Sequence, residues 1–445
     1  MAFYLIILVF VLCYLCIAVE HTIHVSKTAT ALLLCAALWT IVTVSGASAF
    51  APGIFETLGA DYHDGVKAAL LHHLGDTAEI VFFLLGAMTI VEIVDQYGGF
   101  KIITDRIKTT SKVRLLWSLG LITFFMSAVL DNLTTTIVML ALLRKLTTEK
   151  SNTWFFASMV VIAANAGGAW TPIGDVTTIM LWIAGKVSAV NIMKTTFLPS
   201  LVSVVVPFLI LTFTMKGHIT PAEKAFDDNS PAASISPRIR NFMFCLGVGC
   251  LLGVPVFKTV THLPPYVGML GALSIVWIAT EIICTCEKDN EWRLHLRASK
   301  ILRRVDMPSV LFFLGILMAV GALQFCGHLD MMSASLDQIS LEEPSKYYLI
   351  DIIIGTLSSV VDNVPLVAGT MGMYTFPEDH YFWELLAYCA GTGGSMLIIG
   401  SAAGVAAMGI EKIDFIWYVK HITWLAFIGY ICGALVYILQ YSAIH

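Results

Sequence analysis

The chain has 445 residues, of which 58% are hydrophobic and 13% are charged, and its mean hydropathy is +0.82. A bilayer core of roughly 30 Å needs about 20 apolar residues per spanning helix, and stretches of this kind fill the chain and leave no room for a soluble catalytic domain. The net charge is -5 without a basic stripe, which excludes a nucleic-acid partner. The composition therefore indicates an all-α polytopic membrane protein.

Uninterrupted apolar runs predict ordinary transmembrane helices. They lie at about 2–19, 28–46, 77–97, 196–214, 241–257, 266–284, 308–326 and 415–441. The first run has no positive n-region and no small-residue cleavage site, so we expect a retained first helix rather than a signal peptide.

Four further apolar segments are interrupted near their middle. Residues 115–143 and 347–374 each contain an Asp-Asn pair, whereas 153–185 and 382–410 each contain a glycine-rich stretch. Non-helical backbone at membrane depth is tolerated only where it is buried in protein or lines a water-filled cavity. We therefore expect the first two segments to form re-entrant hairpins and the other two to form broken transmembrane helices.

The Lys and Arg residues fall unevenly on the two membrane faces if both predicted hairpins return to the face that they enter. About 20 of the 26 basic residues then lie on one face and about five on the other. The positive-inside rule makes the richer face cytoplasmic. This places both termini outside and the linkers 215–240 and 285–307 in the cytoplasm.

An internal repeat relates the two halves of the chain. The hexapeptide 127–132 (Ser-Ala-Val-Leu-Asp-Asn) matches 358–363 (Ser-Ser-Val-Val-Asp-Asn), and the glycines of 167–174 recur with identical spacing in 393–400. A basic stretch precedes the first Asp-Asn pair and an acidic one precedes the second, so we expect inverted-topology repeats. Inverted repeats with interrupted helices are typical of secondary transporters, whose substrate site lies near the bilayer midplane between the repeats.

The predicted organisation has four parts. They are N-terminal transmembrane helices at 1–50, a first repeat at 51–214 with hairpin 115–143 and broken helix 153–185, a cytoplasmic linker at 215–240, and a second repeat at 241–445 with hairpin 347–374 and broken helix 382–410. Each repeat thus holds one re-entrant hairpin and one interrupted transmembrane helix.

Three carboxylates, Asp131, Asp175 and Asp362, lie deepest in the predicted membrane segments. An ionised Asp near the bilayer centre costs about 2.5–3.5 kcal/mol on insertion scales, so each is a functional candidate. The alternative for Asp131 and Asp362 is helix capping at the hairpin turn. Because both Asp-Asn pairs occupy equivalent places and each precedes a Gly-Gly break, we favour ion binding, with which capping is compatible.

The first glycine-rich break combines unwound backbone with oxygen-bearing side chains. Pro172 and the neighbouring glycines free carbonyl oxygens from helical hydrogen bonds. The side chains are those of Asn165, Thr171, Asp175, Thr177 and Thr178. This hard-oxygen shell suits a small alkali cation, and its carboxylate can bind either the cation or a proton, which is the simplest coupling for antiport. The alternative is a Pro-Gly kink with a solvated Asp at a helix end.

The second glycine-rich break offers hydroxyls without a charge, from Ser395 and Ser401. Two further residues could serve proton movement on the external side. Glu79 is either a proton-path group or a boundary residue of the predicted helix 77–97. His72 precedes that helix and is either an exposed loop residue or a pH sensor, since histidine changes charge near about pH 6.5.

The hairpin tips Leu-Asp-Asn-Leu (130–133) and Val-Asp-Asn-Val (361–364), with Thr-Pro-Ile-Gly-Asp-Val-Thr-Thr at 171–178, closely resemble the NhaD-type sodium/proton antiporters of the ion transporter superfamily. The resemblance runs through essentially the whole chain. It implies exchange of Na⁺, and usually Li⁺, for H⁺ in a bacterial inner membrane or an equivalent one, by a homodimer whose transport part slides against a scaffold. The related divalent-anion/sodium symporters carry Ser-Asn-Thr at the tips, so the tips here favour a cation-only site.

The resemblance also implies which positions are functional. They are His72, Glu79, Asp131, Asn132, Asn165, Asp175, Thr177, Thr178, Ser358, Asn363 and Ser395. Ile398 stands where the family pattern has a hydroxyl, which lowers the number of ligands expected from the second half.

We therefore predict a secondary active transporter, not an enzyme, that exchanges Na⁺ for H⁺ by alternating access in the lipid bilayer and serves pH homeostasis. Na⁺ would bind at Asp131, Asn132, Asp175 and Asn363, and no cofactor besides the transported ions is expected. A sodium-coupled anion transporter of the same superfamily is the alternative. Neither glycine-rich break contains a basic residue, but helix N-termini alone could hold a carboxylate substrate.

Overall fold

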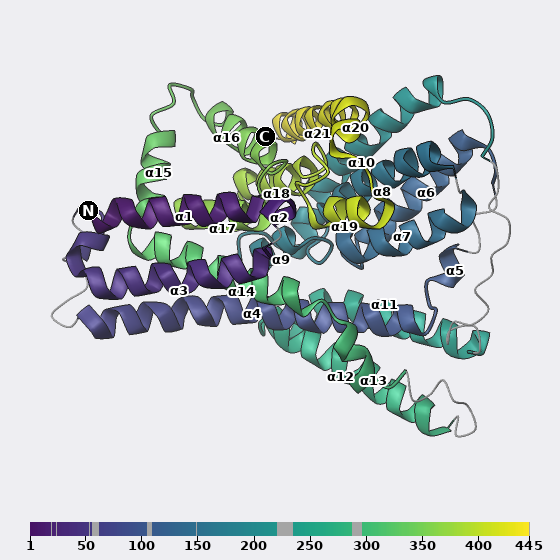
Figure 1. Cartoon of the computed structure of the whole chain (residues 1–445), viewed down its shortest axis with the longest axis horizontal. Coiled ribbons are helices and arrows are strands. Elements are labelled where there is room, and N and C mark those ends of the chain that lie inside the picture. The colour runs from purple at the N-terminus through teal and green to yellow at the C-terminus, as the bar shows by residue number, and fades with distance from the viewer. Residues whose placement is uncertain are drawn as a thin grey trace. The chain divides into compact units, whose positions relative to one another are not determined.

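The computed structural model describes residues 1–18, 20–23, 25–52, 54–55, 62–104, 109–147, 149–219, 235–286 and 296–444. Regular structure in these ranges is helical, apart from one isolated β-bridge between Ser111 and His218 (Figure 1). In chain order the helices are α1 (Ala2–Ala18), α2 (Glu20–Ile23), α3 (Lys27–Ser45), η1 (Gly46–Ala49), α4 (Tyr62–Gln96), α5 (Lys101–Thr104), α6 (Lys112–Ser127), α7 (Asn132–Leu146), α8 (Lys150–Gly168), α9 (Val176–Ile183), α10 (Ala189–Thr214), α11 (Pro237–Thr261), α12 (Pro265–Cys286), α13 (Ala298–Ile301), η5 (Leu302–Arg304), α14 (Met307–Phe325), α15 (His328–Leu336), α16 (Ser345–Leu357), α17 (Asn363–Met373), α18 (Tyr381–Gly393), α19 (Ala402–Glu411), α20 (Phe415–His421) and α21 (Thr423–Ile444). The predicted all-α class is confirmed.

Seven helices of the described ranges are long and apolar enough to cross a membrane. They are α3 with η1, α4, α10, α11, α12, α14 and α21. The predicted class of a polytopic integral membrane protein is therefore confirmed.

The start of α4 differs from the sequence prediction. The helix begins at Tyr62 rather than near residue 77. Its polar first turns carry exposed side-chain pairs at helical spacings, with Lys67 Nζ 3.7 Å from Asp64 Oδ1 and His72 Nδ1 3.1 Å from Asp76 Oδ2. Each pair of this kind adds about 0.2–0.5 kcal/mol to helix stability. The last apolar run differs as well, because it is divided into α20 and α21.

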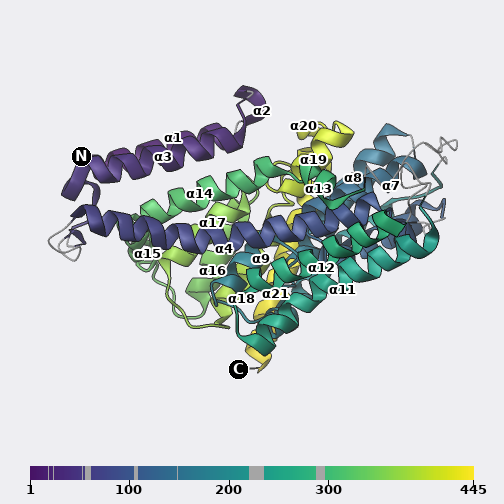
Figure 2. The ribbon, with the colours of Figure 1, turned by 90° about the horizontal axis from the view of Figure 1, so that it is seen from below.

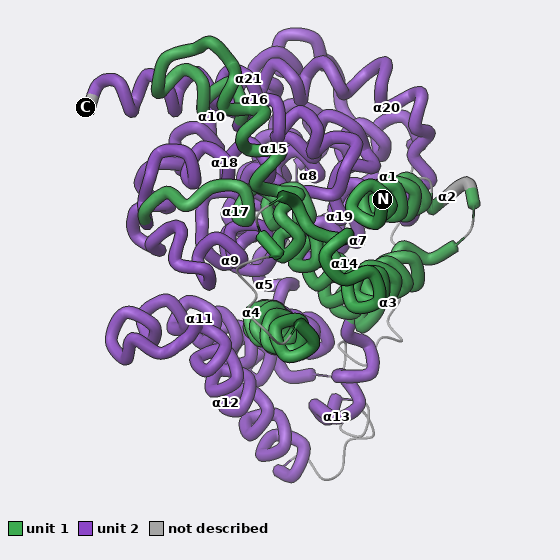
Figure 3. The backbone as a smooth tube through the Cα atoms, turned by 90° about the vertical axis from the view of Figure 1, so that its left-hand side faces the viewer, with its two compact units in different colours: residues 1–82, 306–350, 364–377 green, residues 83–305, 351–363, 378–445 purple. Residues whose placement is uncertain are grey.

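The chain divides into two compact units (Figure 3). Unit 1 comprises residues 1–82, 306–350 and 364–377, and unit 2 comprises 83–305, 351–363 and 378–445. In unit 1, α3 packs along α14, and the indole of Trp39 donates a 2.9 Å hydrogen bond to the carbonyl of Met318. A Cβ on Gly315 would lie 2.7 Å from the backbone of Ala31, so this glycine permits the close approach of the two helices.

The predicted interruptions appear as breaks between consecutive helices. They lie at 128–131 between α6 and α7, 169–175 between α8 and α9, 358–362 between α16 and α17, and 394–401 between α18 and α19. Helices α6–α9 are followed by α10, and helices α16–α19 are followed by α20 and α21. The two long helices α10 and α21 lie side by side in unit 2 (Figure 1). A Cβ on Gly429 of α21 would lie 2.3 Å from the carbonyl oxygen of Ser203 of α10, so glycine is required at this crossing.

Parts of both predicted cytoplasmic linkers, 220–234 and 287–295, lie outside the described residues. After the first linker, α11 begins at Pro237, a residue favoured at the first helical position. The hydroxyl of Ser236 caps it by accepting from the backbone N–H of Ile239. In unit 2, α11 packs against α12 (Figure 2).

Candidate ion-binding site

The break between α6 and α7, which is the predicted first hairpin tip, is built around Asp131, and this residue caps α7. Its φ is 98°, a left-handed value that turns the chain between α6 and α7. The two carboxylate oxygens accept hydrogen bonds from the backbone N–H and the hydroxyl of Thr134, both at 2.8 Å. The carboxylate of Asp131 is therefore held by the helix that it caps, and a proton or cation must compete with these two donors.

The first break is built around Asp175, which caps α9 and is 1% exposed. Its Oδ1 accepts from the backbone N–H and the hydroxyl of Thr177, each at 3.0 Å. The hydroxyl of Thr178 donates back to the carbonyl of Asp175 at 2.9 Å. Glycine is required here, because a Cβ on Gly174 would lie 2.7 Å from the carbonyl oxygen of Ser127. Close packing therefore brings the first hairpin tip against the break.

The second oxygen of Asp175 belongs to a buried network of amides. The side-chain amide of Asn132 donates to Asp175 Oδ2 at 2.7 Å and to Asn165 Oδ1 at 3.1 Å. The amide nitrogen of Asn363 lies 3.3 and 3.5 Å from the two oxygens of Asp175. Both hairpin tips thus present an amide to one carboxylate.

The network continues into the second break through Asn165, which is fully buried. Its amide nitrogen donates to the hydroxyls of Ser395 and Ser401, each at 2.9 Å. The cluster therefore contains residues of both halves of the chain. Its members are Asn132, Asn165, Asp175, Asn363, Ser395 and Ser401, which we call the Asp175 cluster.

The other two predicted carboxylates flank the Asp175 cluster. Asp131 and Asp362 are partly buried, and each lies within electrostatic range of Asp175. A cation bound among them would lower the repulsion between these like charges. The site can therefore hold positive charge, either as a metal ion or as protons.

The predicted hydroxyls of Thr171 and Ser358 lie outside the Asp175 cluster, and each donates to a backbone carbonyl of a neighbouring segment. Thr171 donates to the carbonyl of Ala128 in the first tip at 2.6 Å. Ser358 donates to the carbonyl of Ala390 in α18 at 2.9 Å, as Ser127 does to a carbonyl of α8. These bonds fix the hairpin tips to the broken helices.

His72 and Glu79 both lie on α4 within unit 1, whereas the Asp175 cluster lies within unit 2. The His72 side chain is 73% exposed and pairs with Asp76, within α4 rather than in the predicted loop. Glu79 is partly buried on the same helix. Proton-path and sensor roles for these two residues stay predictions.

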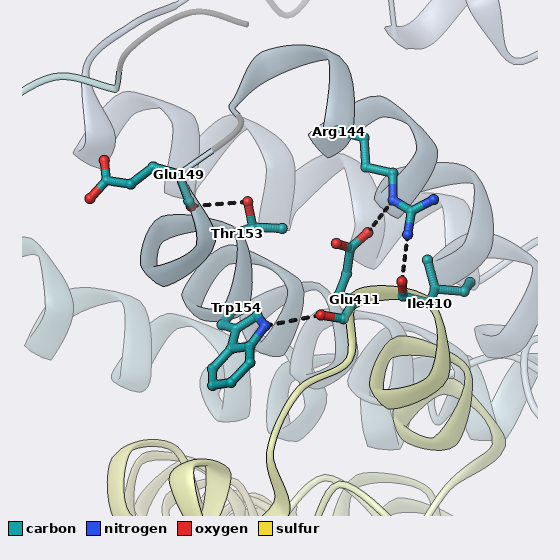
Figure 4. Close-up of polar contacts among 6 residues, drawn as sticks. All are labelled: Arg144, Glu149, Thr153, Trp154, Ile410 and Glu411. Carbon is teal, nitrogen blue, oxygen red and sulfur yellow. Dashed lines mark hydrogen bonds and ion pairs between the residues drawn. The ribbon is translucent and has the colours of Figure 1, made fainter.

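One polar contact between the ends of three helices is absent from the sequence prediction (Figure 4). Arg144 at the end of α7 lies 2.7 Å from the carboxylate of Glu411 at the end of α19, and it also donates to the carbonyl of Ile410. The indole of Trp154 in α8 donates to the carbonyl of Glu411 at 3.0 Å. We call this group the Arg144 latch. An Arg here stabilises the last carbonyls of α19 as well as the ion pair.

The sequence of the chain is similar to those of known transporters. Residues 14–383 match the family model described as citrate transporter. The chain is 45% identical to sodium/proton antiporter 1 of Arabidopsis thaliana over 98% of this chain and 72% of that protein. It is 30% identical to the Na⁺/H⁺ antiporter NhaD of Vibrio cholerae over 98% of this chain and 91% of that protein, and 29% identical to NhaD of Alkalimonas amylolytica over 97% and 89%.

Proposed function

The chain belongs to the citrate-transporter family and, within it, to the NhaD-type sodium/proton antiporters, and from this premise we propose that it exchanges Na⁺ for H⁺ across a membrane. The observation that carries the proposal is the Asp175 cluster, in which one buried carboxylate meets an amide from each hairpin tip. A site with one central carboxylate and neutral oxygens suits a monovalent cation.

The chemistry at Asp175 is a competition between Na⁺ and H⁺ for one carboxylate. Burial favours the neutral, protonated carboxyl, whereas a bound cation favours the ionised one. Asn132 and Asn363 donate N–H groups to this carboxylate. Rotation of either amide would present its oxygen to a cation in place of its nitrogen. The same residues thus serve both states, and the loss of a proton accompanies the entry of Na⁺.

Alternating access is the transport step of this proposal. The Asp175 cluster contains residues from the two matching parts of the chain, α6–α9 and α16–α19. A movement of one part against the other would change the side of the membrane from which the ion is accessible. The proposal includes Li⁺ as a second cation and a homodimer in the lipid bilayer, with no enzymatic step. Relatives come from plants and bacteria, and the bacterial inner membrane stays our prediction for its location.

Everted membrane vesicles provide the test. With an acid interior established, added NaCl should dissipate the proton gradient, because Na⁺ enters as protons leave. Asp175→Asn should abolish this response at unchanged membrane insertion. Asp64→Asn, which removes a 73% exposed carboxylate from α4, is the control and should respond as the wild type does. Full dissipation by Asp175→Asn would refute the assigned site.

A second candidate is a sodium-coupled anion transporter, which the description of the matching family model favours. Helix N-termini at the breaks could bind a carboxylate anion. In the same vesicles this candidate predicts that NaCl acts only when citrate or another dicarboxylate or tricarboxylate is present. Dissipation by NaCl alone would exclude it.

A further inference from the structure

Asp351 is a buried carboxylate that the Asp175 cluster does not include. It lies in α16 within the apolar run Leu-Ile-Asp-Ile-Ile-Ile, and its side chain is 0% exposed. Within the described part of the chain, neither of its carboxylate oxygens has a hydrogen-bond partner. A buried polar group without a partner destabilises the fold by its full desolvation penalty, and a charged group does so more strongly.

The position of Asp351 on α16 directs it toward α18. Gly355 and Ser358 each lie within about 40° of it around the helix axis. Both contact α18, since a Cβ on Gly355 would lie 2.6 Å from the carbonyl oxygen of Cys389 and Ser358 donates to Ala390. Asp351 is therefore on the stripe of α16 that ends at the second hairpin tip, about 10 Å along the helix from Ser358.

The groups that face Asp351 provide no compensating charge. On α18, the thiol of Cys389 interacts with it electrostatically. On α21, Tyr430 directs its hydroxyl to the carbonyl of Ile352, at 2.8 Å. The sequences of α18 and α21 contain no Lys or Arg. Because no counter-ion lies within reach among the residues that the structure describes, burial favours the neutral, protonated carboxyl of Asp351 over the charged carboxylate.

The fold itself does not require a carboxylate at this place. Alignment of the two Asp-Asn pairs puts Gly120 of α6 at the position of Asp351. A Cβ on Gly120 would lie 2.0 Å from the ring of Phe208, so an aromatic side chain fills the equivalent space. An apolar residue would therefore meet the packing demand at lower free-energy cost, which gives Asp351 a role other than packing.

We propose that Asp351 is a second proton-binding residue of the transport cycle, an inference that rests on the proposed Na⁺/H⁺ exchange. A proton adds to one carboxylate oxygen of Asp351 on one face and leaves it to water on the other, and no other bond changes. Asp175 exchanges one proton for one Na⁺, so the Asp351 proton moves in addition. Exchange is consequently electrogenic, with one more proton than Na⁺ per cycle.

Proteoliposomes with a clamped membrane potential test this stoichiometry. The proton-to-Na⁺ ratio is obtained from the Na⁺ gradient at which net proton flux reverses. Asp351→Asn should lower the ratio by one proton and remove the dependence of exchange on membrane potential. The control is Glu384→Gln, a buried carboxylate of the same unit that already has partners in Tyr437, at 2.6 Å, and Asn191, and it should keep the wild-type ratio.

An unchanged ratio in Asp351→Asn would overturn the proposal. A different result would refute the proposed Na⁺/H⁺ exchange itself. In that case the wild type would show no Na⁺-driven proton flux at any membrane potential. If Asp351→Asn does not fold, infrared spectroscopy of the wild type and of Asp351→Glu gives a second test. A protonated-carboxyl band that shifts in Asp351→Glu should be lost at alkaline pH. A band that persists at all pH values, with and without Na⁺, would overturn the proposal.

Discussion

The side-chain amide of Asn132 donates a 2.7 Å hydrogen bond to Oδ2 of Asp175 and so connects the first hairpin tip to the first broken helix. Asp131 precedes Asn132 directly, but its carboxylate turns back to cap α7. The residue of the first Asp-Asn pair that reaches the central carboxylate is therefore the amide. Under the proposed exchange, loss of the Asn132 amide should therefore affect Na⁺ binding at Asp175 directly.

Asn132→Ala should weaken Na⁺ binding without blocking insertion. The variant loses the amide oxygen that the proposed rotation would present to Na⁺, and loss of a supporting group around a bound metal ion typically costs about tenfold to about hundredfold in affinity, so the KM for Na⁺ should rise by about that factor. The initial rate of Na⁺-dependent proton movement in everted vesicles measures this. Asn152→Ala, which removes a buried amide bonded to Glu149 instead, is the matched control. Equal KM values in the two variants would contradict the role of Asn132.

Gly174→Ala should destabilise the packing of the break against the hairpin tip. Its Cβ would lie 2.7 Å from the carbonyl oxygen of Ser127 and 2.8 Å from the Cα of Gly168, and neither backbone can yield easily. Overpacking of this kind costs about 1–3 kcal/mol. Gly409→Ala is the control, because a Cβ there meets nothing within 4 Å. Thermal unfolding in detergent should give a Tm below that of the wild type for Gly174→Ala but not for Gly409→Ala. Equal Tm values for the two variants would show that the break can accommodate a Cβ at residue 174.

Thr178→Val should loosen the cap of α9 while keeping the shape of the side chain. The variant loses the hydroxyl oxygen that accepts from the backbone N–H of Asp175 at 3.3 Å in the capping box of α9, and loss of such a cap costs about 1 kcal/mol. Thr178→Ser keeps the hydroxyl and should restore the wild-type Tm. Thr285→Val, at an exposed helical hydroxyl, serves as a control for the substitution itself. A Thr178→Val protein as stable as the Thr178→Ser protein would rule out the cap.

The Arg144 latch should show a measurable coupling between α7 and α19. Arg144 is 55% exposed and Glu411 9% exposed, so solvent screens the pair and its coupling should not exceed about 1 kcal/mol. A double-mutant cycle of Arg144→Ala and Glu411→Ala on unfolding free energy measures it. The coupling should shrink in high salt. Additive effects of the two substitutions would mean that the ion pair contributes nothing.

The breaks in the helices could be predicted from sequence because their causes are local. Gly167 and Gly168 at the end of α8, with Pro172 and Gly174 in the break that follows, end the helix by backbone chemistry alone. Asp175 precedes the first turn of α9 as an N-cap residue should. The apolar runs likewise predict the membrane class, since hydropathy needs no tertiary information.

Other features depend on contacts that sequence spacing does not reveal. Arg144 and Glu411 are separated by 267 residues, so nothing local indicates their contact. The turn of Asp131 toward Thr134 follows from its left-handed backbone, which the sequence does not specify. The start of α4 was predicted too late, because hydropathy overlooks polar helical turns held by pairs such as His72 and Asp76.

Proton release on Na⁺ binding to the purified protein tests the central claim most directly. Adding NaCl to the weakly buffered protein in detergent, with a pH indicator present, should release protons from the wild type, because Na⁺ displaces them from Asp175. Asp175→Asn should bind Na⁺ weakly and release none from this site, with Asp64→Asn behaving as the wild type. Na⁺ binding by the wild type without proton release, or equal release from Asp175→Asn, would contradict competition at this carboxylate.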